Sequence, residues 1–132
     1  MKGLDTNVLV RYFAQDDPVQ SRKATEIMER WLTEDEPGFV SLVTMVETVW
    51  VLSRVYDLSS QEIANVVEGM LQSDTLVIQN EQEVFTAVAA LRAGRGSLAD
   101  ALVSALGRWA GCTATVTFDK KTSRLEGFEL VG

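Results

Sequence analysis

Short strand-like segments alternate with longer helix-like segments from one end of the chain to the other. The strand-like segments hold apolar or β-branched residues, and the helix-like segments carry apolar side chains every three or four positions. Strands are expected at 2–4, 39–41, 76–78, 113–118 and 128–131, and helices at 7–13, 18–31, 43–56, 59–71, 84–91 and 98–109. This order predicts an α/β fold, because a helix can join each strand to a parallel neighbour.

The length of 132 residues corresponds to one domain. We expect a single Rossmann-like, three-layer domain over residues 1–132, with a central parallel sheet flanked by helices. The segment 113–118 is expected in the centre of this sheet and 128–131 at its edge. Parallel sheets of this kind bind ligands at the carboxyl ends of their strands, so polar residues directly after strands are the first candidates for a site.

Capping residues indicate where several of the helices begin and end. Asp17 followed by Pro18 is typical of a helix N-terminus, because proline at the first helical position has no N–H to leave unpaired. Ser59 and Glu62 have the spacing of a capping box. Gly111 is expected to stop the last helix.

Histidine is absent, and this excludes several kinds of active site. Serine or cysteine nucleophiles activated by histidine, histidine general bases and most zinc sites are ruled out. The single cysteine, Cys112, is expected to be a small buried residue rather than a nucleophile. An enzyme with this composition must use carboxylates, hydroxyls and lysines.

The net charge of −7 argues against a generally basic nucleic-acid-binding surface. It favours either a basic protein partner or a set of carboxylates that hold hard cations. No apolar run approaches the roughly 20 residues of a membrane span. The first residues also lack the pattern of a signal peptide, so a cytoplasmic location without membrane attachment is expected.

Four acidic residues stand at unusual positions. Asp5 and Asp119 directly follow the expected strands at 2–4 and 113–118. Glu47 and Asp100 lie within the apolar helices expected at 43–56 and 98–109. Taken singly, each aspartate after a strand could be a helix N-cap, and each acid within a helix could simply face solvent.

Taken together, the four acids predict a metal site. Carboxylates gathered about 5 Å apart repel one another by roughly 3 kcal/mol for each pair at an effective dielectric constant near 20. A divalent cation offsets this repulsion, and ligation by oxygen alone suits Mg²⁺ or Mn²⁺ rather than zinc. We expect the carboxylates of Asp5, Asp100 and Asp119 to share a cation, with Glu47 bound directly or through water.

These residues and their surroundings resemble the four acidic motifs of the PIN domain family. The motifs are GLDTNVLV around Asp5, the helix around Glu47 after Ser41, LADALV around Asp100 and VTFDKK around Asp119. Their order, their spacing and the closing segment RLEGFEL are similar to the VapC-type toxins of bacterial toxin–antitoxin pairs. Many relatives carry another acid three residues before the third motif acid, where this chain has Ser97.

The resemblance implies an endoribonuclease that hydrolyses RNA phosphodiester bonds with Mg²⁺ or Mn²⁺. Its catalytic and metal-binding residues would be Asp5, Glu47, Asp100 and Asp119, supported by Thr6, Asn7, Ser41 and Thr117. RNA contacts would come from Arg11, Arg92, Arg95 and Arg108, although each is also an ordinary surface arginine. Water, the metal or a lysine such as Lys120 would supply general acid help.

The resemblance also implies two protein partners, a second copy of the chain and an antitoxin similar to VapB. A basic antitoxin that places arginine on the four carboxylates would complement the acidic chain. The helix around Glu47 supports a partner, because apolar residues cover about half of its circumference.

Two other interpretations stay open at this point. A haloacid-dehalogenase-like phosphatase also begins with an aspartate after the first strand, but it needs a second carboxylate where this chain has Asn7. A non-catalytic acidic interaction module is the second alternative. A metal titration followed by a ribonuclease assay separates these possibilities.

Overall fold

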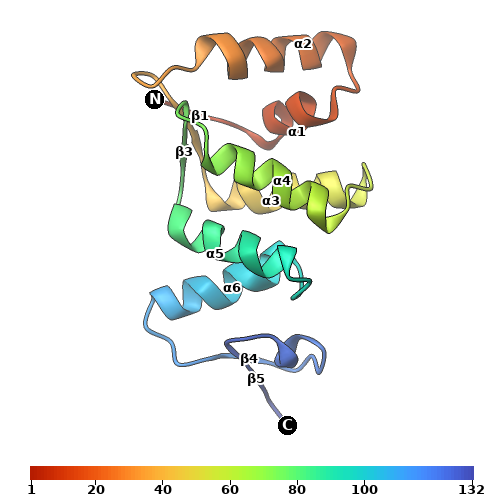
Figure 1. Ribbon diagram of the computed structural model, residues 1–132, viewed down its shortest axis with the longest axis vertical. Helices are drawn as coiled ribbons and strands as arrows, with labels where there is room; N and C mark the ends of the chain where they lie inside the picture. Colours follow the sequence, from red (N-terminus) through yellow and green to blue (C-terminus); the bar gives the residue numbers. More distant parts are fainter. The chain divides into compact units, whose positions relative to one another are not determined.

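The computed structural model describes residues 1–132, which form two compact units. The first unit contains residues 1–80 and the second contains residues 81–132 (Figure 1). All strand pairs in both units are parallel, and this confirms the predicted α/β fold with parallel strands. The organisation of residues 1–132 as a single domain stays a prediction.

The first unit is built around a three-stranded parallel sheet. The strands are β1 (Lys2–Gly3), β2 (Gly38–Val40) and β3 (Leu76–Ile78), in the order β1-β2-β3. A hydrogen bond of 2.9 Å from the Leu4 amide to the Phe39 carbonyl extends the β1–β2 pairing to the residue before Asp5. The sheet fits tightly at Gly38, where an added Cβ would lie 2.8 Å from Leu4 Cδ1.

Four α-helices complete the first unit. They are α1 (Thr6–Ala14), α2 (Pro18–Glu26), α3 (Leu42–Arg54) and α4 (Ser60–Leu71). The predicted caps are confirmed, since Asp17 accepts hydrogen bonds at the start of α2 and Ser59 forms a capping box with Glu62 at the start of α4. The helix expected at 18–31 changes its winding, because residues Ile27–Trp31 form a π-helical segment, η1.

The second unit contains α5 (Glu81–Arg92), α6 (Leu98–Trp109), β4 (Thr115–Thr117), the short 3₁₀ segment η2 (Thr122–Arg124) and β5 (Phe128–Leu130). The two helices pack against each other, and their buried apolar side chains are Val84, Ala87, Val88, Leu91, Leu98 and Leu102. A second capping box begins α6, formed by Ser97 and Asp100.

Two expectations for the region after α6 are wrong. The central strand expected at 113–118 is shorter, covers only Thr115–Thr117, and pairs with β5 in a two-stranded sheet. Cys112 is exposed rather than buried, because it lies in the turn that ends α6, where its amide bonds the Gly107 carbonyl at 2.9 Å. The β-branched residues of 113–118 indicated a strand, but they did not show how much of the segment the turn takes up.

None of the helices is long and apolar enough to cross a membrane.

The cap of α2 gives a test of this local structure. Asp17 Oδ1 accepts hydrogen bonds from the amides of Val19 at 3.0 Å and Gln20 at 2.8 Å. Asp17→Ala is expected to lower the free energy of unfolding in urea by about 1 kcal/mol, because both amides lose their acceptor. Asp35→Ala removes the same charge from an exposed bend and should change stability little. Equal losses in the two variants would mean that charge, and not capping, sets the effect.

Candidate active site

The parallel pairing of β1 with β2 makes the helices next to Asp5 and around Glu47 begin at the same edge of the sheet. Asp5 follows β1 and is the N-cap of α1, and Ser41 follows β2 and is the N-cap of α3. Neighbouring parallel strands end at the same edge, so α1 and α3 both begin there. Glu47 lies on α3, beyond this starting point.

Thr6 connects the Asp5 and Glu47 carboxylates. Its backbone amide donates a hydrogen bond of 2.8 Å to Asp5 Oδ1, and its hydroxyl donates to Glu47 Oε1. The Thr6 side chain is buried, whereas both carboxylates are exposed to solvent. Although Thr6 and Glu47 are 41 positions apart in the sequence, one buried threonine therefore holds both acids in place.

The other predicted supporting residues in this unit have different surroundings. The hydroxyl of Ser41 caps α3 by accepting from the Thr44 amide at 3.1 Å. Asn7 has an exposed side chain in the first turn of α1.

Thr48 is a further polar residue of α3 that was not predicted to have a role. Its hydroxyl is fully buried without a hydrogen-bond partner, one turn from Thr44.

Asp100 lies in the first turn of α6 in the second unit. Its Oδ2 accepts from the Ser97 amide at 3.4 Å, and its own amide donates to Ser97 Oγ at 3.1 Å. Ser97 therefore caps α6. Gly96 has a φ of +79°, and a Cβ at this position would lie 2.6 Å from Leu125 Cδ1 and 3.4 Å from Asp100 Oδ2. The positive φ favours glycine here, and the Leu125 side chain packs against this turn.

Asp119 follows β4, and backbone amides hold its carboxylate. Its Oδ1 accepts from the amides of Lys121 at 2.8 Å and Thr122 at 3.0 Å, and its own amide donates to Thr117 Oγ1 at 3.1 Å. The hydrogen bond from the Thr122 amide, with help from Lys121, lowers the pKa of Asp119 below its ordinary value. Because its pKa is lowered, Asp119 is ionised at neutral pH. Its side chain is exposed and therefore open to a cation.

The predicted residues are thus divided between the two units. The first unit brings Asp5 and Glu47 together at Thr6, and the second carries Asp100 and Asp119. Neither unit alone gathers three or more acidic or cysteine side chains into a group that could hold a metal ion. A site with all four acids needs both units and stays a prediction.

Comparison with known protein families decides the identity of the fold. The PIN domain model matches residues 3–127, which include all four acids. The chain belongs to the PIN domain family. Membership points to nuclease activity, to RNA as substrate and to the use of divalent metals, which are general in these nucleases. No curated protein matches the chain.

The acids of this PIN domain fit a hard divalent cation. Asp5, Glu47 and Asp119 are exposed carboxylates that offer only oxygen donors, and no histidine competes for the metal. Asp5 and Glu47 each use one oxygen to accept a hydrogen bond from Thr6, which leaves the second oxygen of each for a cation. Oxygen ligands of this kind suit Mg²⁺ and Mn²⁺.

The four arginines expected to contact RNA have different environments. The Arg11 guanidinium is held by Asp16 at 3.0 Å and by Gln20 at 2.9 Å. Arg92 is half-buried, whereas Arg95 and Arg108 line a cavity of the second unit. The network around Arg11 was not foreseen, because its members come from the loop after α1, from α2 and from the segment after α3. Contact of any of these arginines with RNA stays a prediction.

The network around Arg11 predicts a measurable pKa. The hydrogen bond from the Tyr56 hydroxyl, together with Arg11, lowers the pKa of Asp16 below its ordinary value. The network therefore stabilises the fold above the ordinary aspartate pKa of about 3.9, and this contribution is lost as the pH falls through the lowered pKa of Asp16. Tyr56→Phe removes the largest cause, so the pKa of Asp16 should rise in an NMR titration of its carboxyl carbon.

Tyr12→Phe is the matched control, because the Tyr12 hydroxyl bonds Glu29 at 2.8 Å instead. This variant should leave the pKa of Asp16 unchanged. An unchanged pKa of Asp16 in Tyr56→Phe would contradict the assigned cause.

Proposed function

We propose that this PIN domain is a Mg²⁺- or Mn²⁺-dependent endoribonuclease and the toxin of a cytoplasmic toxin–antitoxin pair. The observation that carries the proposal is the double hydrogen bonding of Thr6, which fixes the carboxylates of Asp5 and Glu47 at the carboxyl edge of a parallel sheet. Family membership adds nuclease activity, and the proposal adds Asp100 and Asp119 as further ligands of the same cation.

The proposed reaction is hydrolysis of an RNA phosphodiester bond. A cation held by Asp5, Glu47, Asp100 and Asp119 would lower the pKa of a bound water and neutralise charge on the phosphate. The amide and the hydroxyl of Thr6 hold the carboxylates of Asp5 and Glu47 in fixed orientations. Little ordering of these two side chains is therefore needed when the cation binds. Asp119 or Glu47 would orient the attacking water, and water, the metal or a lysine such as Lys120 would supply the proton to the leaving oxygen.

The proposal includes a VapB-like antitoxin and a second copy of the chain as partners. Their support is a groove on α3 lined by Leu42, Val43, Val46, Glu47 and Trp50. Val43 and Trp50 are 79% and 58% exposed there, beside the acidic Glu47. An apolar segment of a partner that carries arginine would cover the apolar side chains and pair with the Glu47 carboxylate.

Substitution of the acids tests the proposed reaction. Glu47→Gln keeps size and hydrogen bonding but removes the charge, so RNA cleavage with Mn²⁺ should fall by at least about 100-fold while the fold survives. Asp5→Ala, Asp100→Ala, Asp119→Ala and their double mutants should be about equally inactive, because the acids act as one unit.

Glu34→Gln is the matched control, since it removes the same charge from an exposed position before β2 and should cleave RNA normally. Full cleavage by the four acid variants, or by wild type in excess EDTA, would contradict the proposal. Hydrolysis of p-nitrophenyl phosphate without RNA cleavage would support the phosphatase alternative.

Metal binding can be tested separately from catalysis. A cation that binds only the folded protein stabilises it by about 2.7 kcal/mol when its concentration exceeds Kd about 100-fold. We expect Mn²⁺ to raise Tm in wild type and Asp5→Asn to abolish most of this rise, as measured by thermal denaturation followed by circular dichroism. Asp35→Asn should keep the full rise, and equal shifts in all three proteins would indicate a general salt effect.

A further inference from the structure

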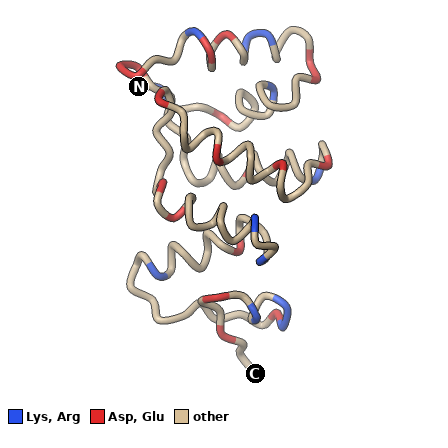
Figure 2. Tube along the Cα trace, in the orientation of Figure 1, with Lys and Arg blue, Asp and Glu red and all other residues tan.

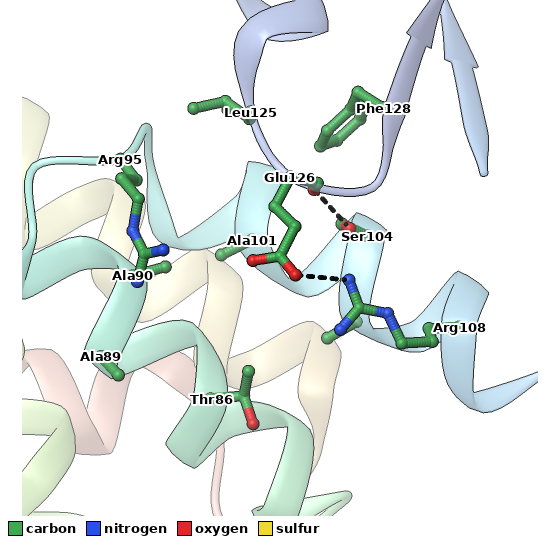
Figure 3. A pocket seen from close by; sticks show the side chains of 11 residues that line it. Thr86, Ala89, Ala90, Arg95, Ala101, Ser104, Arg108, Leu125, Glu126 and Phe128 are labelled. Atoms are coloured by element: carbon green, nitrogen blue, oxygen red, sulfur yellow. Dashed lines mark hydrogen bonds and ion pairs between the residues drawn. The ribbon is translucent and has the colours of Figure 1, made fainter. Parts of the chain in front are cut away.

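The second unit contains a cavity of about 140 Å³ between α5, α6 and the segment that leads from η2 into β5 (Figure 3). This volume is several times the roughly 30 Å³ that one water occupies in the liquid. The walls are formed mainly by small or apolar side chains: Ala89, Ala90, Ala101, Ala105, Leu125 and Phe128. None of the four acids of the candidate active site lines this cavity.

Two arginines give the cavity a positive charge. Figure 3 shows the side chains of Arg95 and Arg108 on different sides of the cavity, with the Glu126 carboxylate directed to Arg108. The Arg108–Glu126 ion pair is long, at 3.6 Å, and its side chains are 59% and 74% exposed, so solvent weakens it. Two guanidinium groups against one carboxylate leave one positive charge to attract an anion, in a chain whose net charge is −7.

The wall that carries Glu126 and Phe128 is fixed on α6. Ser104, which is only 8% exposed, donates a hydrogen bond of 2.9 Å to the Glu126 carbonyl. Gly127 follows with a φ of +86°, and a Cβ there would lie 2.1 Å from Ser104 Oγ. Only glycine allows this approach of backbone to helix, so the cavity is formed before a ligand arrives.

The combination of walls fits one nucleotide of a single-stranded RNA. Bases in single-stranded RNA stack on aromatic rings and on apolar surface, and arginine binds phosphate through two parallel hydrogen bonds. Phe128 and the alanines provide the apolar surface, and Arg95 and Arg108 provide the phosphate donors. Arg108 can exchange its weak contact with Glu126 for a phosphate without losing a buried partner.

We infer that the cavity lined by Arg95, Arg108 and Phe128 binds a nucleotide of the RNA substrate, with the base against Phe128 and the neighbouring phosphates on the two arginines. The inference rests on the proposed function for the choice of RNA. It gives an acidic nuclease a local basic contact for the RNA chain.

The test measures binding of a short, fluorescently labelled single-stranded RNA by anisotropy in EDTA, where metal-dependent cleavage does not occur. Arg95→Gln and Arg108→Gln should each raise Kd and lower the slope of log Kd against log salt by about 0.7, the value for one phosphate contact on a single strand. Phe128→Leu keeps an apolar side chain in the wall and should raise Kd about tenfold through loss of stacking. Arg30→Gln, which removes an exposed arginine of the first unit, should leave Kd unchanged.

Unchanged Kd in both Arg95→Gln and Arg108→Gln would overturn the inference, and so would an equal loss of affinity in Arg30→Gln. Displacement of the RNA by a polyglutamate peptide of the same charge as effectively as by unlabelled RNA would show that the cavity recognises negative charge alone, which also overturns it. The proposed function is tested separately with Asp5→Asn, which should bind RNA normally in EDTA but should not cleave it with Mn²⁺. Normal cleavage by this variant would contradict the proposed function and not the cavity inference. If wild type binds RNA through the cavity but shows no metal-dependent cleavage, the proposed nuclease function is contradicted and the inference about the cavity is not.

Discussion

The parallel pairing of β1 with β2 is the constraint on which the candidate site depends. It extends to the hydrogen bond between the Leu4 amide and the Phe39 carbonyl, one residue before Asp5. This pairing starts α1 and α3 from the same sheet edge, so that Thr6 can bond both Asp5 and Glu47. A side chain at Gly38 would require the Leu4 side chain to shift, because its Cβ would lie 2.8 Å from Leu4 Cδ1. The positions of the Asp5 and Glu47 carboxylates thus depend on backbone hydrogen bonds inside the sheet.

The same hydrogen bonds that shape the chain also prepare its acids for a cation. Asp5, Asp100 and Asp119 each accept backbone amide hydrogen bonds at the start of a helix or turn, which fixes their rotamers. A helix N-cap and a metal ligand are therefore compatible roles for one carboxylate, since its second oxygen stays available. The N-cap interpretation is correct for Asp5, which caps α1, and wrong for Asp119, because the helical segment after β4 is capped by Lys121.

Much of the fold could be predicted from the sequence, because the signals were local. The capping box of Ser59 with Glu62 and the Asp17–Pro18 start are set by residues a few positions apart, and both appear as predicted. The predicted length of β4 and the predicted burial of Cys112 were wrong. The turn after α6 depends on a hydrogen bond from the Cys112 amide to the Gly107 carbonyl, which the spacing of apolar residues does not show. Of the site, the family resemblance placed Asp5, Glu47 and Thr6 in one candidate site, and the structure joins them by two hydrogen bonds from Thr6. It could not foresee the cavity wall at Gly127, because the fit to Ser104 arises only in the folded chain.

The proposal that four acids from the two units share one cation is tested most directly by paramagnetic broadening with Mn²⁺. Substoichiometric Mn²⁺ broadens the NMR signals of amides close to the bound ion. The account predicts that the amides of Thr6, Thr48, Ala101 and Lys120 lose intensity together, while those of the acidic bend around Asp35 keep it. Broadening confined to the amides of one unit, or equal broadening around Asp35, would contradict a shared site.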